Sequence, residues 1–168
     1  MKKCSKLIYF SAMGIVSIWA NNISAKPAVE INQLSFVQPP QTKAWNDYPR
    51  TRGDWRLSLN EDGSTARYLD QNENSLFQVD CRVSIPSITI WRAGQTQGSQ
   101  LIKIRTETLE EVFRTRSSSG ISIELEPTHP LLDAMSITIG RFSVEVEGME
   151  TLYLPAWAEF SRVVEDCR

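Results

Sequence analysis

Residues 152–168, LYLPAWAEFSRVVEDCR, hold the pattern that decides the fold of this chain. Apolar residues after Pro155 recur at spacings of three and four and charged residues take the other side, which predicts an amphipathic helix from Pro155 to Cys167. A proline is tolerated in the first turn, because its missing N–H would have no helical partner there. The apolar stripe comprises Trp157, Phe160, Val163, Val164 and Cys167. We therefore expect Cys167 to face the core from the last turn.

The chain upstream of this helix, from Asp54 onward, has a dominant period of two, which is typical of half-buried strands. The segments DWRLSL and TARYL flank the turn-rich NEDGS, and this arrangement predicts a β-hairpin. Trp55, Leu57 and Leu59 share one face of its first strand. In LFQVDCRV the alternation places Cys81 on the inward face.

Three further elements are predicted between these segments. SITIW (87–91) and LIKIRTET (101–108) flank the turn-rich RAGQTQGSQ, so we expect them to form a second hairpin. THPLLDAM predicts a short helix that Thr128 caps. The apolar phase slips by one residue beside Gly140, which predicts a β-bulge or a tight bend.

The first residues have the layout of a secretory signal peptide, with three lysines before an apolar run from Leu7 to Ala20. We expect cleavage after Ala25, which leaves about 143 residues, enough for one domain with its own core. The predicted organisation is a signal peptide over 1–25, a proline-containing arm over 26–53 and a single β-rich domain over 54–168. A periplasmic or secreted location follows from this prediction.

Two cysteines remain once Cys4 leaves with the signal, and both are predicted to face the core. In an oxidising compartment we expect Cys81 and Cys167 to form a disulfide, which closes a loop of about 87 residues. The sequence thus predicts a mainly β fold, an antiparallel sheet or small sandwich with a C-terminal α-helix and one disulfide.

The charge balance excludes some classes of partner. The full chain has 18 basic and 20 acidic residues, and loss of the signal makes it more acidic. Such a chain does not favour nucleic acid, and after signal removal no apolar segment reaches the length of a membrane span. The common catalytic motifs are absent, we expect no cofactor and no metal site, and catalytic activity stays uncertain, leaning towards none.

A few residues are candidates for chemistry or binding. His129 is the only histidine, and it would need an orienting carboxylate such as Asp133 to act as a base; a turn and cap is the competing interpretation. Trp45, Tyr48 and Trp91 are interpreted as a candidate exposed aromatic binding surface, with core packing as the alternative for the aromatic residues as a group. The tripeptide Arg-Gly-Asp at 52–54 is interpreted as a loop that enters a strand.

Three motifs in residues 129–168 carry a family resemblance: Gly-Arg-Phe at 140–142, LYLPxW at 152–157 and RVxEDCR at 162–168. With them the chain resembles a family of uncharacterised secreted or lipid-anchored proteins of Gram-negative bacteria. The resemblance implies a small envelope domain with no established functional residues, although this chain lacks the cysteine of lipid-anchored members at the signal boundary. More distantly, the arrangement of cysteines, strands and final helix is similar to a periplasmic accessory protein of type VI secretion systems.

From these observations we expect a non-enzymatic binding or interaction module whose partner is an envelope protein or glycan. Two alternatives stay open. One is a hydrolase of envelope polymers that uses His129 or carboxylates, and the other is an accessory protein of a secretion system.

Overall fold

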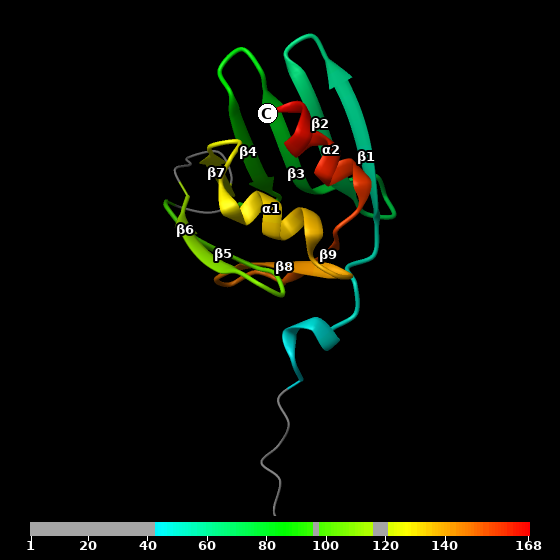
Figure 1. Ribbon diagram of the computed structural model, residues 1–168. Coiled ribbons are helices and arrows are strands. Elements are labelled where there is room, and N and C mark those ends of the chain that lie inside the picture. Colours follow the sequence, from blue (N-terminus) through cyan, green and yellow to red (C-terminus); the bar gives the residue numbers. More distant parts are fainter. Residues whose placement is uncertain (1–42, 96–97, 116–120) are drawn as a thin grey trace, which may run out of the picture. The chain divides into compact units, whose positions relative to one another are not determined.

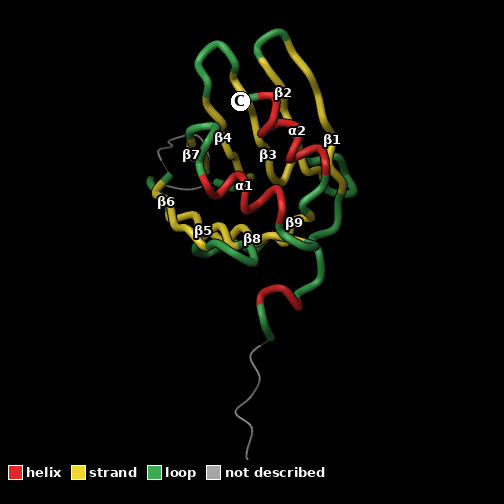
Figure 2. The backbone as a smooth tube through the Cα atoms, in the orientation of Figure 1, coloured by secondary structure: helices red, strands yellow, loops and turns green. Residues whose placement is uncertain are grey.

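Two antiparallel sheets and two α-helices make up the computed structural model, which describes residues 43–95, 98–115 and 121–168 (Figures 1 and 2). The five-stranded sheet, in the order β1-β2-β3-β4-β7, consists of β1 (Asp54–Asn60), β2 (Gly63–Leu69), β3 (Ser75–Arg82), β4 (Ser87–Arg92) and β7 (Ile121–Leu125). The four-stranded sheet, in the order β6-β5-β8-β9, consists of β5 (Leu101–Arg105), β6 (Glu110–Arg114), β8 (Arg141–Val146) and β9 (Leu152–Pro155). The helices are the short 3-10 helix η2 (Trp45–Asp47), α1 (Pro130–Ile137) and α2 (Ala158–Asp166).

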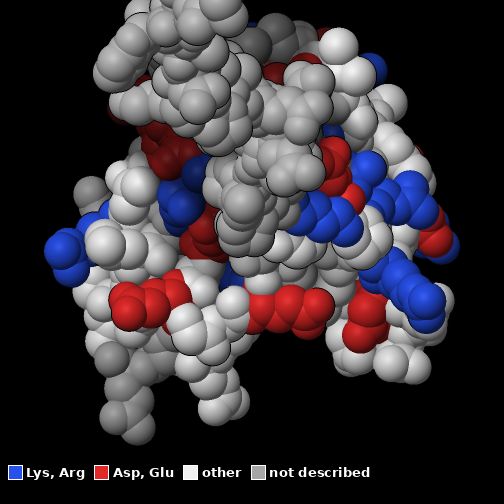
Figure 3. Space-filling view, turned by 90° about the horizontal axis from the view of Figure 1, so that it is seen from below, with Lys and Arg blue, Asp and Glu red and all other residues white. Residues whose placement is uncertain are grey.

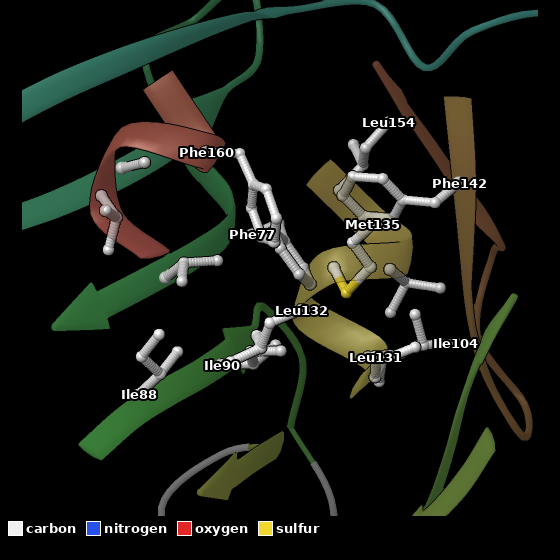
Figure 4. Packing of buried hydrophobic residues seen from close by; sticks show 14 of the residues in the cluster. Phe77, Ile88, Ile90, Ile104, Leu131, Leu132, Met135, Phe142, Leu154 and Phe160 are labelled. Carbon is white, nitrogen blue, oxygen red and sulfur yellow. The ribbon is translucent and has the colours of Figure 1, made fainter. Parts of the chain in front are cut away.

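The hydrophobic core lies between the two sheets, because each sheet turns its apolar face inward. In β3 the alternating residues Phe77 and Val79 are fully buried, as the period of two predicts. Figure 4 shows α1 between strands of the two sheets, with Leu131, Leu132 and Met135 among the core side chains. Burial of each such side chain contributes about 1.5–3 kcal/mol. The mainly β fold is therefore confirmed.

The final helix, α2, crosses the inner face of β1, β2 and β3. It begins beside Trp55, whose ring centroid lies 6.2 Å from that of Phe160, and it is followed by Cys167, which is bonded to Cys81. Trp55 lies near the start of β1 and Cys81 near the end of β3, and these two strands run in the same direction. The helix therefore runs diagonally over the sheet.

The predicted disulfide between Cys81 and Cys167 is confirmed, with a Cα–Cα distance of 5.4 Å. Both cysteines are buried, one on a strand and the other at the C-cap of α2. The bond fastens the last turn of α2 to the five-stranded sheet.

The start of the last helix differs from the prediction. Pro155 is the last residue of β9, where it pairs with Arg141, and α2 starts three residues later. A proline is compatible with an edge strand such as β9, because a missing N–H costs little on the open side. Trp157 consequently becomes the N-cap, and it is 37% exposed rather than part of the apolar stripe.

The prediction of a second hairpin is wrong. SITIW forms β4, which pairs with β3 and β7, whereas LIKIR forms β5, which pairs with β6 and β8 in the other sheet. The connection between them passes from one sheet to the other. An alternating pattern reports which side chains face the core, but it does not identify the neighbouring strand.

Around α1, the helix cap differs from the prediction and the bend at Gly140 agrees with it. His129, not Thr128, caps the helix, because its Nδ1 accepts a hydrogen bond from the Leu131 N–H at 3.2 Å. Of the two predicted explanations for the phase slip beside Gly140, the tight bend is confirmed and the bulge is not. The slip marks the passage from α1 through a turn, with Gly140 at φ +82°, into β8. The mixed period arises because residues that precede the turn belong to a helix.

A buried arginine links the two sheets. Arg92 lies on the inward face of β4, is only 7% exposed, and donates a hydrogen bond of 2.6 Å to the Glu150 carbonyl in the turn between β8 and β9. It also donates to the Ala93 carbonyl and to the Met149 sulfur. Burial lowers the pKa of this guanidinium, and the nearby Glu150 carboxylate opposes that shift. The cation is thus held by one carbonyl oxygen from each sheet, Glu150 in the β8–β9 turn and Ala93 just after its own strand, and by the Met149 sulfur.

The tips of the β1–β2 and β3–β4 hairpins are joined through Asp62. Its carboxylate accepts hydrogen bonds of 2.9 Å from the Ser84 N–H and from the Ser84 hydroxyl, and its carbonyl accepts one from the Val83 N–H. The bonds from Ser84, backbone first, lower the pKa of the Asp62 carboxyl. The folded structure therefore stabilises the ionised form of the Asp62 carboxyl.

Loss of the disulfide should destabilise the fold strongly. In the chain-entropy view a loop of this size contributes about 4–5 kcal/mol, as an upper figure. We expect the Cys81→Ser, Cys167→Ser double variant, and the reduced native protein, to unfold at a clearly lower urea concentration than the oxidised protein. An unchanged unfolding midpoint would show that the bond does not restrain the helix.

The Asp62 carboxylate should make stability dependent on pH in the acid range. Because its pKa is lower in the folded state, its contribution is present above the unfolded value of 3.8 and is lost as the pH falls through the folded value. We expect Asp62→Asn to lower the urea midpoint at pH 7, and the difference from the native protein to shrink at pH 2.5. Glu61→Gln in the same turn is the matched control and should show no such change. A difference for Asp62→Asn that is equal at both pH values would contradict this assignment.

Candidate functional site

Residues 48–53 lead from the edge of the four-stranded sheet to the start of β1, and β9 fixes them there. The Thr51 N–H donates to the Tyr153 carbonyl at 2.9 Å, and the Tyr153 N–H donates to the Thr51 hydroxyl at 2.9 Å. Just downstream, the Trp55 indole N–H donates to the Pro155 carbonyl at 2.9 Å. This segment of the predicted arm is therefore bound to β9 at Thr51, and Trp55 fixes the start of β1 just after it.

Tyr68 holds the same segment through two hydrogen bonds from its hydroxyl. Its hydroxyl lies 2.6 Å from the Thr51 carbonyl oxygen and 2.9 Å from that of Gly53. Burial raises the pKa of Tyr68, with a smaller opposing effect from Arg50, so the hydroxyl stays protonated and able to donate. The backbone path of residues 51–53 is thus set by a buried donor.

Gly53 is required where the segment meets β2. It has φ +151°, and a Cβ atom built there would lie 2.2 Å from the carbonyl oxygen of Leu69. Only glycine allows this close approach. The Arg-Gly-Asp tripeptide accordingly enters a strand, as predicted, since Asp54 is the first residue of β1.

Three arginines meet in a cleft of about 330 Å³ beside this segment. Arg50, Arg52 and Arg56 are exposed, and none of them lies within 4.0 Å of a carboxylate oxygen among the residues that the structure describes. The Arg50 guanidinium lies over the Trp157 ring, 4.9 Å from its centroid. The Arg56 guanidinium donates to the carbonyl of Trp55 at 3.3 Å. All three retain N–H groups that face solvent.

The cleft also contains three acidic residues. Asp70 is committed to its own turn, where its carboxylate accepts the N–H groups of Asn72 and Asn74 at 2.8 Å and the Asn74 side-chain amide at 3.0 Å. These bonds, that of the Asn74 side chain first, lower the pKa of Asp70. Asp54 and Glu73 also line the cleft, and their carboxylates are not held by such turn hydrogen bonds. The cleft therefore offers three cationic groups and two available carboxylates.

Residues of the same segment also line a second, larger cleft of about 780 Å³. Arg50 and Arg52 line both clefts, and Glu150, Thr151 and Tyr153 line the second one. In Figure 3 basic side chains gather on the right, which is the side of β1 in Figure 1, with acidic side chains among them. The segment thus contributes cationic side chains to both hollows.

The structure does not bring the predicted aromatic set together. Tyr48 stacks on Tyr153 with centroids 5.2 Å apart, and the Lys43 ammonium lies 4.9 Å from its centroid. Trp45 is half-buried in η2, whereas Trp91 is half-buried on β4 of the other sheet. The stacking on Tyr153 places the Tyr48 ring where it holds residues 48–53 against β9.

His129 and Asp133 are likewise not brought together. Besides its capping bond, His129 has Nε2 at 3.7 Å from a carboxylate oxygen of Glu111, and Asp133 pairs with Arg168 at 2.7 Å. The expected orienting partner of the histidine is therefore engaged elsewhere. Within the described ranges, no group of three or more His, Cys, Asp or Glu side chains is placed to hold a metal ion.

The three cleft arginines were not predicted as site residues from the sequence. The available signal was the density of arginine in RTRGDWR, residues 50–56. Their convergence depends on the Tyr68 support and on the β2–β3 turn, which are distant from them in the chain.

Replacement of Gly53 should disturb the backbone of the segment that carries the cleft arginines. Gly53→Ala places a methyl group against the Leu69 carbonyl, so we expect a loss of stability of about 2 kcal/mol or more, measured by urea unfolding. Gly140→Ala is the matched control, since Gly140 also has positive φ but no atom within 4 Å of the added methyl. It should lose only about 1 kcal/mol from the backbone conformation. Equal losses would show that the contact with Leu69 is unimportant.

Among the described residues, no helix has the length and apolar character required to span a membrane. Comparison of the chain with protein-family models, with curated proteins and with solved structures finds no match.

Proposed function

We propose that this protein is a non-enzymatic binding module of the cell envelope that recognises an anionic group, a carboxylate or a phosphate, through the cleft of Arg50, Arg52 and Arg56. The observation that carries the proposal is the convergence of these arginines, without an ion-pair partner among the described residues, on one hollow. A guanidinium presents paired N–H donors that match a carboxylate or phosphate in a bidentate manner.

The two available carboxylates narrow the class of ligand. Asp54 and Glu73 face the same hollow and would repel a uniformly anionic polymer. A ligand that carries one or two anionic groups beside neutral or cationic groups fits better. Peptide stems and modified glycans of an envelope have this mixed character, which agrees with the expectation of an envelope protein or glycan as partner.

A periplasmic or secreted location forms part of the proposal. It is supported by the disulfide, which persists in oxidising compartments, and by the signal-like pattern over 1–25, which lies outside the described residues. The hydrolase alternative has weaker support, because His129 and Asp133 each have another partner. No contact favours the role of a secretion-system accessory protein, which stays a prediction from the arrangement of elements.

The proposal predicts that binding depends on the cleft arginines. We expect the Arg52→Gln, Arg56→Gln double variant to bind at least 10-fold more weakly than the native protein, because charge-assisted hydrogen bonds contribute about 1.5–3 kcal/mol each. Isothermal titration with two probes distinguishes the ligand chemistry: a soluble peptidoglycan fragment presents carboxylates, and a phosphorylated lipopolysaccharide core presents phosphates.

Arg67→Gln is the matched control. Arg67 is exposed on β2 and donates to Gln78 at 2.8 Å, outside the residues that line the cleft, so its loss removes the same charge without changing the site. This variant should bind as the native protein does. Equal binding by all three proteins, or no binding of either probe at 50 mM salt, would refute the proposed site.

A further inference from the structure

One edge of the five-stranded sheet is open for pairing. β1 pairs with β2 on one side over all seven of its residues, and no described strand lies on its other side. Alternate backbone N–H and C=O groups of an edge strand point away from its neighbour. β1 contains no proline, no lysine and no bulge, three of the features that commonly block an edge, and its charged residues are limited to Asp54 and Arg56. Its outer edge is therefore competent to accept another strand.

The inward face of β1 is largely uncovered. Trp55 is 2% exposed, but Leu57 and Leu59, which share its face, are 40% and 71% exposed. The cause is the diagonal course of α2, which starts over Trp55 and moves away from β1 towards Cys81. An amphipathic strand thus keeps two leucines in contact with solvent.

A groove lies beside Leu57. It has a volume of about 610 Å³, and Leu57, Ala156, Ala158, Glu159, Ser161, Arg162 and Glu165 line it. One wall is the inward face of β1 and the other is the side of α2. A strand added to β1 would place its inward side chains in this groove.

We propose that the occupant is a second copy of this chain, whose β1 pairs antiparallel with β1 about a two-fold axis at Leu57. An axis perpendicular to the sheet keeps the inward faces of both copies on the same side. The pairing then joins two five-stranded sheets into one continuous sheet.

The sequence of β1 selects this register. With the axis at Leu57, all seven residues pair, Asp54 lies opposite Asn60, Arg56 lies opposite Ser58, and no like charges face each other. An axis at Arg56 would set two arginines against each other and shorten the ladder to five residues. An axis at Ser58 also shortens the ladder to five residues. The register at Leu57 is therefore the longest and the best matched in charge.

The same register fills the groove. Leu57 of one copy meets Leu57 of the other, and Leu59 of each copy lies opposite Trp55 of the other, beside the start of α2. The most exposed leucine of β1 thus enters the groove lined by Ala156 and Ala158 of its partner. The same two-fold pairing therefore satisfies the unpaired N–H and C=O groups at the edge of β1 and covers Leu57 and Leu59.

Sedimentation equilibrium of the full protein and of two variants tests the proposal. We expect the native protein to dimerise and Leu57→Lys to weaken the dimer at least 100-fold, because the two lysines would meet at the axis. Val112→Lys is the matched control, since Val112 is 55% exposed on the edge strand β6 of the other sheet, and it should dimerise as the native protein does.

A cross-link checks the register. Leu57→Cys should give a disulfide-linked dimer under mild oxidation, with the two introduced cysteines joined in a peptide map, whereas Leu101→Cys, at 45% exposure on β5, should not. A native protein that stays monomeric up to millimolar concentration would overturn the proposal. So would a dimer that Leu57→Lys leaves intact, or one that Val112→Lys disrupts equally.

Discussion

The indole of Trp55 is the contact on which the rest of the structure depends. Its ring packs in the core against the rings of Tyr68, Phe77 and Phe160, with centroids 5.3–6.2 Å apart. Its N–H donates to the Pro155 carbonyl, just where β9 ends and α2 begins. One side chain therefore joins both sheets to the final helix. It is also the only buried residue of β1, so this edge strand is held to the core at a single point.

The faces of the strands and the disulfide could be predicted from the sequence, because both follow from local periodicity and from the cysteine count. Phe77 and Cys81, for example, are buried as the alternating pattern predicts. The partners of β4 and β5 could not be predicted in this way, because an alternating pattern is compatible with either sheet. The start of α2 was misplaced because Pro155 is acceptable both in a first helical turn and at the end of an edge strand.

The candidate site was harder to predict than the fold. In the sequence, arginines at 50, 52 and 56 look like ordinary surface charges. Their convergence depends on the close approach of Gly53 to β2 and on the hydrogen bonds from Tyr68 to the backbone of this segment. Of the aromatic residues singled out in the sequence, Tyr48 stacks on Tyr153 and so helps to hold the segment in place. Tyr48 thus supports the segment that carries two of the cleft arginines.

The position of the disulfide has a consequence for survival among proteases. The bond spans 86 positions, and the enclosed segment contains β4 to β9 and both α-helices, hence the whole four-stranded sheet. A single cut anywhere within that segment leaves the two fragments covalently joined and their core contacts at high effective concentration. Proteolytic damage to an exposed loop there would nick the protein without dismantling it.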